Sequence, residues 1–146
     1  ELLGSGQSGE RKRPMLEMLI ETGVALERYA YTTNPGNKGC EGKNDRPAYT
    51  IAAGGSSEFC LETTPGEDGH VSAKVNVTYK IVGDPQGRTV RMWSLTPLYT
   101  YNLLGCELLK ADMDTLDKSA PYECDVEWRK DRHSYDPAPR VVLKKK

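Results

Sequence analysis

Residues 71–82 form a stretch in which apolar and polar side chains alternate. The apolar positions are Val71, Ala73, Val75, Val77, Tyr79 and Ile81, and polar residues stand between them. Because successive side chains of a strand point to opposite faces, this pattern predicts a half-buried β-strand. Its apolar face points either into a packed core or into a hollow that holds a ligand.

Other extended segments follow one another along the chain with few interruptions. The patterns predict strands at 24–33, 47–53, 58–64, 88–95, 98–103, 106–111 and 122–129. The connectors between them are short and rich in Gly, Pro, Asp and Ser, which are the residues of tight turns. Short connectors favour antiparallel neighbours in a meander over a parallel sheet.

Residues 14–23 have a different pattern, which predicts a short helix. Pro14 suits the first helical position, Leu16, Leu19 and Ile20 share one helical face, and Gly23 is a natural terminator. We expect a flexible N-terminal segment at 1–13, a single domain at 14–135 and an extended basic tail at 136–146.

These elements predict an all-β fold, an antiparallel up-and-down barrel of eight strands with a short N-terminal helix. Closure of a meander into a barrel removes both exposed edges, and a two-sheet sandwich is the main alternative. An eight-stranded barrel is either filled by side chains or holds one small ligand.

Charge and hydropathy exclude several classes of partner. The chain has 146 residues with 20 basic and 21 acidic side chains, so its net charge is -1. That balance gives no field for binding nucleic acid, and no stretch approaches the ~18 apolar residues of a membrane helix. We therefore expect no nucleic-acid partner and no membrane insertion.

The cysteines indicate disulfides and an extracellular location. Cys40, Cys60, Cys106 and Cys124 are far apart and have no histidine at zinc-ligand spacing, so two disulfides in one of three connectivities are favoured over a metal site. The sequon that begins at Asn76 lies on the polar face of the predicted strand, where a glycan could project into water. Both features favour a secreted glycoprotein.

No catalytic constellation is visible in the sequence. His70 and His133 each stand beside turn residues, and no nucleophile or phosphate-binding motif occurs. The alternating acids of 112–117 lack the later bidentate Glu of a calcium loop. We expect neither an enzyme nor a cofactor.

One stretch carries a family resemblance. The segment "CELLKADMDTLDKSAPYECDVEWRKD" at 106–131 resembles the end of the barrel in tick salivary lipocalins, and "LERYAYTTNPGNKGC" at 26–40 agrees with their first strand in outline. The resemblance implies a secreted salivary protein that sequesters a small host mediator, a lipid mediator or a biogenic amine, and so suppresses host defence. Val126 stands where the family's amine binders carry an acid, which weakens the amine alternative. No cysteine follows Trp128, which departs from the family's disulfide scheme.

The aromatic residues supply the candidate ligand contacts. The chain has eight Tyr and two Trp but one Phe, so much of its buried aromatic surface carries a polar group. The predicted pocket residues are Tyr29, Tyr31, Tyr79, Trp93, Tyr101 and Glu107. The alternative is a disulfide-braced protein that binds and inhibits a host immune protein, such as complement or a chemokine, through its surface. A solid interior favours that alternative, and an open pocket with converging polar groups favours sequestration.

Overall fold

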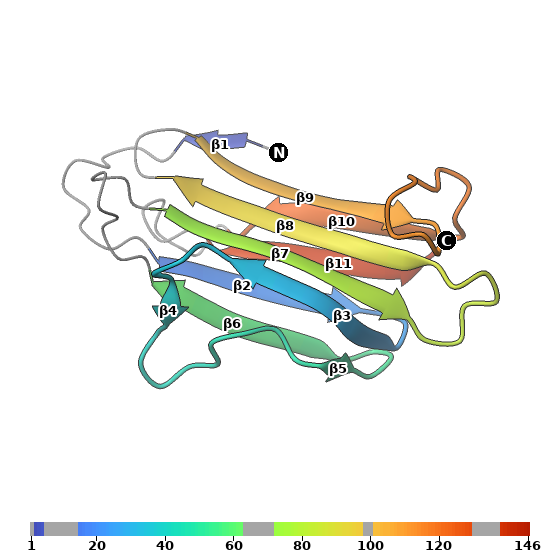
Figure 1. The fold of residues 1–146 in the computed structure, drawn as a ribbon, viewed down its shortest axis with the longest axis horizontal. Coiled ribbons are helices and arrows are strands. Elements are labelled where there is room, and N and C mark those ends of the chain that lie inside the picture. The colour runs from blue at the N-terminus through green and yellow to red at the C-terminus, as the bar shows by residue number, and fades with distance from the viewer. Residues whose placement is uncertain (1, 5–14, 63–71, 98–100, 130–137) are drawn as a thin grey trace.

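The computed structural model describes residues 2–4, 15–62, 72–97, 101–129 and 138–146, which form two β-sheets in two layers (Figure 1). The strands are β1 Leu2–Gly4, β2 Met15–Thr22, β3 Leu26–Thr33, β4 Lys38–Gly39, β5 Thr50–Ile51, β6 Ser56–Glu62, β7 Ser72–Ile81, β8 Thr89–Pro97, β9 Tyr101–Leu109, β10 Tyr122–Trp128 and β11 Pro139–Lys145. Within these ranges there is no helix that could cross a membrane.

The two sheets have different strand orders. Sheet A runs β1-β9-β8-β7-β3-β5, and sheet B runs β10-β11-β2-β6-β4. All pairings are antiparallel except that of β11 with β2, which is parallel. The prediction of an all-β, mainly antiparallel fold is confirmed, but the closed up-and-down barrel is wrong. The connections from β2 to β3, β6 to β7 and β9 to β10 pass from one sheet to the other, so these chain neighbours face each other across a sandwich instead of pairing.

The predicted N-terminal helix is also wrong. Residues 15–22 form β2, which pairs with β6 on one side and β11 on the other. Leu16, Met18 and Ile20 alternate along β2 and are fully buried. Their period of two residues fits a strand, and the helical spacing of Leu16, Leu19 and Ile20 was a coincidence of apolar residues.

Most of the predicted strands are present with shifted ends. The stretch 71–82 corresponds to β7, and the two strands predicted at 98–103 and 106–111 form the single strand β9. Only Thr50–Ile51 of the predicted strand at 47–53 is a strand, and the Ala48 N–H just before it donates to the Ser57 hydroxyl of β6.

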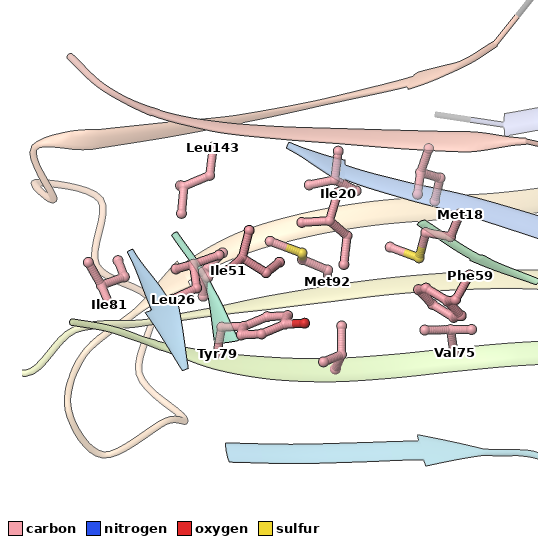
Figure 2. Packing of buried hydrophobic residues seen from close by; sticks show 14 of the residues in the cluster. Met18, Ile20, Leu26, Ile51, Phe59, Val75, Tyr79, Ile81, Met92 and Leu143 are labelled. Atoms are coloured by element: carbon pink, nitrogen blue, oxygen red, sulfur yellow. The ribbon is translucent and has the colours of Figure 1, made fainter. Parts of the chain in front are cut away.

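The apolar face of β7 points into a packed core between the sheets. Val75, Val77 and Tyr79 are fully buried and belong to one contiguous cluster with residues of sheet B such as Phe59 and Leu143. Figure 2 shows Val75 and Tyr79 of sheet A in one cluster with Phe59 and Leu143 of sheet B. Each such side chain stabilises the fold by about 1.5–3 kcal/mol relative to an exposed one.

Two disulfides brace the sandwich, as the sequence predicts, and the structure gives their connectivity. Cys40–Cys60 ties the segment after β4 to β6 within sheet B, with 5.4 Å between Cα atoms. Cys106–Cys124 joins β9 of sheet A to β10 of sheet B, with 6.0 Å between Cα atoms. The second bridge therefore fixes the spacing of the two layers at one edge.

A buried ion-pair cluster joins the hairpin loop after β7 to the loop before β10. The Arg88 guanidinium contacts the carboxylates of Asp117 at 2.8 Å and Asp84 at 3.1 Å, and the Tyr122 hydroxyl donates to Asp84 at 2.7 Å. Burial alone raises the pKa of Asp84, but hydrogen bonds from the Arg88 backbone, Tyr122 and the Arg88 side chain outweigh it and lower the pKa. The hydrogen bond from Arg88 likewise lowers the pKa of Asp117.

Candidate functional site

A β-bulge separates the two predicted tyrosines of β3. The register shifts between Arg28 and Ala30, so Tyr29 is an extra residue on β3. Tyr29 is 59% exposed, and the Lys80 ammonium lies 5.2 Å from its ring centroid. Tyr31 is half-buried and packs edge-on against Phe59, with 6.1 Å between ring centroids. The bulge therefore turns one tyrosine outward and the other toward the interior.

Trp93 and Glu107 lie on the outer face of sheet A. Each alternates with an inward-facing neighbour, since Met92 and the disulfide-bonded Cys106 precede them on β8 and β9. The Trp93 ring lies against Gly105, where an added Cβ would overlap the ring. Glu107 forms an ion pair with Arg91 on the neighbouring strand.

The other two predicted pocket residues lie elsewhere. Tyr79 is fully buried in the core, and its hydroxyl donates a 2.6 Å hydrogen bond to the carbonyl oxygen of Ala48. Desolvation raises its pKa well above the usual range for tyrosine. Tyr101 belongs to β9, but its side chain lies outside the described residues. The predicted residues whose side chains are described thus do not converge on one pocket.

A pocket of about 550 Å³ opens on the outer face of sheet B, beside the Cys40–Cys60 disulfide. We call it the loop pocket, and its lining residues are Glu17, Gly42, Lys43, Asn44, Glu58, Phe59 and Cys60. The segment 40–44 forms one wall, and the strands β2 and β6 form the floor.

Local sequence explains how the wall of the loop pocket is built. The Lys43 backbone N–H donates to the Cys40 carbonyl oxygen at 3.1 Å, and Gly42 has a φ of 75°, which together give the geometry of a type II turn. The Asn44 carbonyl oxygen accepts a hydrogen bond from the Cys60 N–H at 2.9 Å. Gly39 lets the loop return closely, because a Cβ there would lie 2.5 Å from the Cβ of Asp45. The turn thereby holds Lys43 above β2.

Charges of both signs meet in the loop pocket. Glu17 is only 6% exposed, although it points away from the core, and the Lys43 ammonium lies 3.1 Å from its carboxylate. The Lys43 side chain is 47% exposed. Arg129 contacts the Glu58 carboxylate at 3.2 Å and donates to the Glu17 backbone oxygen at 2.7 Å. The pocket therefore holds a buried anion whose positive partner reaches in from the surface.

Sequence reasoning missed this pocket. Glu17 falls in the segment predicted as a helix, and Lys43 and Asn44 fall in a turn-rich stretch that carries no motif. One available signal was the acid between Leu16 and Met18, which alternation would place on the outer face of a strand.

Three inward groups have buried polar atoms without a hydrogen-bond partner in the described structure. They are the Tyr31 hydroxyl, both side-chain polar atoms of Asn102 and the Trp128 indole nitrogen. Burial raises the pKa of Tyr31 to about 12. Among the same described ranges, no group of three His, Cys, Asp or Glu side chains could hold a metal ion.

No protein-family model matches the chain, and a search of curated proteins gives no match. The resemblance to tick salivary lipocalins therefore stays a prediction.

Proposed function

We propose that this chain is an extracellular binding protein that captures another protein on its outer surface, through the loop pocket. The observation that carries the proposal is the buried carboxylate of Glu17, which is neutralised by the half-exposed ammonium of Lys43. A basic side chain of a partner protein can take the place of the Lys43 ammonium beside the Glu17 carboxylate.

The chemistry of the pocket favours a lysine or arginine side chain on the partner. A charge pair that excludes water is stronger than an exposed pair, and truncating one member of such a pair at an interface costs about 2–5 kcal/mol. Lys43 has only to swing into solvent to make room, since its stem is long and its side chain is half-exposed. Gly42, Lys43 and Asn44 of the disulfide-anchored loop line one side of the pocket.

The packed core supports surface binding over sequestration in the centre of the fold. Side chains from both sheets fill the space between β7 and β2, where the predicted hollow would lie (Figure 2). Complement components and chemokines, the predicted immune partners, stay proposals. A basic protein surface is the feature that the pocket selects.

Capture of basic peptides in solution tests the proposal. We expect hexapeptides with one Lys or Arg to shift the backbone amide NMR signals of Lys43, Asn44 and Glu58, while the same peptides with norleucine do not. Glu17→Gln should weaken binding at least about tenfold. The matched control is Glu123→Gln, which removes an exposed acid of β10 that lies 3.7 Å from Lys144. No shift at millimolar peptide, or an equal loss in both variants, would contradict the proposal.

An extracellular location is supported by the two disulfides and by the position of the sequon. Disulfides persist in oxidising compartments. Asn76 pairs with Trp93 on the outer face of sheet A, so a glycan attached there would lie along an aromatic ring. We propose that Asn76 is glycosylated. A glycosidase-sensitive mass increase of secreted protein, abolished by Asn76→Gln, would support this assignment, and an unmodified secreted protein would contradict it.

Sequestration of a small mediator stays a second candidate. Its support comes from Asn102, which is fully buried between the sheets with both polar atoms of its side chain unpartnered in the described structure.

A further inference from the structure

Asn102 is the unusual residue of the sandwich interior. It lies on β9, is 0% exposed, and neither its side-chain oxygen nor its nitrogen has a hydrogen-bond partner among the described residues. A buried amide without partners destabilises a protein, because its hydrogen bonds to water are lost on folding and no protein group replaces them. A bound molecule that forms the missing hydrogen bonds is one of the few explanations for such a group.

Trp128 on β10 has the same property. Part of its side chain is exposed, yet its indole N–H is buried and has no partner within the described ranges. The indole N–H is therefore shielded from water although the residue as a whole is not fully buried. An indole N–H can only donate, so the missing partner must be an acceptor.

The inter-sheet disulfide places these two residues at the same end of the sandwich. Asn102 is four residues before Cys106, and Trp128 is four residues after Cys124. β9 and β10 run in opposite directions (Figure 1), so both residues lie about 13 Å from the disulfide on the same side of it. Because four residues are two full alternations, both side chains share the inward face of their cysteine.

The inward side chains that the structure describes around these two residues are uncharged. On the inward faces near Asn102 and Trp128 lie Leu104, Val126 and Ser94. The Ser94 hydroxyl already donates to the Leu103 carbonyl oxygen at 3.2 Å, so it does not serve Asn102. A charged group brought to this place would have no opposite charge among the described neighbours, and its burial would be unfavourable.

We propose that this end of the interior binds a small uncharged amphiphile, whose polar group is a primary amide or an alcohol. Either group both donates and accepts, so it satisfies the Asn102 oxygen, the Asn102 amide and the Trp128 indole together. The apolar part of the ligand lies against Leu104 and Val126. This site is separate from the loop pocket, and the inference deepens the second candidate function, sequestration of a small molecule, on which it rests; capture of a protein through the loop pocket does not depend on it.

Stability measurements give the first test. Asn102→Leu should raise the thermal midpoint of ligand-free protein by about 3–6 °C, because the substitution removes a buried amide that has no partner. Ser94→Ala is the matched control, since it removes an equally buried group that has a partner, and it should lower the midpoint. A lower midpoint for Asn102→Leu would overturn the proposal, because the amide would then be paired in the folded protein.

Ligand titrations followed by NMR give the second test, with octanamide and 1-octanol as probes and octanoate and octylammonium as charged controls. We expect the neutral probes to shift the Asn102 amide and the Trp128 indole signals, the latter assigned with Trp128→Phe. Asn102→Leu should weaken binding at least about tenfold, and the charged controls should bind at least about tenfold more weakly. The proposal would be overturned if the Asn102 and Trp128 signals show contact with water and do not respond to either neutral probe. That result would identify a buried water molecule as their partner.

Discussion

Replacing Arg88 by methionine should destabilise the protein strongly at neutral pH. The substitution keeps the apolar stem but removes the guanidinium, which contacts the carboxylates of Asp84 and Asp117. These two carboxylates are 0% and 5% exposed, so both would stay buried without a positive partner. Removing one member of a buried ion pair costs about 3–5 kcal/mol, and we expect Arg88→Met to lower the free energy of unfolding by that amount.

The loss of unfolding free energy in Arg88→Met should be smaller at low pH than at neutral pH. The pKa values of Asp84 and Asp117 are lowered in the folded protein, so their stabilising contribution is present above the unfolded pKa of about 4 and is lost as the pH falls through the folded values. In Arg88→Met the two carboxylates lack the guanidinium. Protonation neutralises them and so removes the free-energy cost of burying their charge. The difference in unfolding free energy between wild type and variant should therefore shrink below about pH 4.

Urea unfolding at pH 7 and pH 3, followed by fluorescence, measures both quantities. Arg91→Met is the control, because Arg91 forms its ion pair with Glu107 on the outer face with 34% of its side chain exposed, and exposed pairs contribute about 0–1 kcal/mol. If Arg88→Met costs no more than Arg91→Met, or if its cost is the same at both pH values, the reasoning about burial is refuted.

Three further predictions concern packing and bracing. Replacing Cys106 and Cys124 together by alanine should lower the unfolding free energy by about 3 kcal/mol in urea titrations, since the bridge closes a loop with a separation of 18 residues. Gly105→Ala should cost about 1–3 kcal/mol through its clash with Trp93, and thermal denaturation should show most of that cost disappearing in a Trp93→Ala background. Tyr79→Phe should cost about 1 kcal/mol in the same assay, because a buried carbonyl oxygen loses its donor.

Local patterns were sufficient to predict most strands. The alternation of 71–82 indicates β7 because one face of that strand is buried and the other meets solvent, which is the condition that produces a period of two. The same rule fails at β2, where Leu16, Leu19 and Ile20 fit a helix and Leu16, Met18 and Ile20 fit a strand. Pairing with β6 and β11, which are far away in the sequence, decides between the two patterns.

Whether the strands close into a barrel, and where the candidate site lies, depend on contacts between residues far apart in the sequence. Local patterns do not predict these contacts. A barrel and a sandwich can share strands and turns, and they differ only in which strands pair. The bulge at Tyr29 moves one tyrosine outward with no Gly or Pro to mark it, so the alternation that predicts a shared face for Tyr29 and Tyr31 fails. The loop pocket arises because the Cys40–Cys60 bridge brings Lys43 over Glu17, and the sequence left three disulfide connectivities open.

The parallel strand β11 has a consequence for synthesis of the protein. β11 lies between β10 and β2, and its residues 140–143 pair with residues 19–22 of β2. On a ribosome, β2 emerges more than a hundred residues before β11, so one edge of β2 stays open while the residues between them are made. Sheet B can be completed only after β11 leaves the exit tunnel. Until then, only chaperones or the pairing of β2 with β6 protect the apolar face of β2 from aggregation.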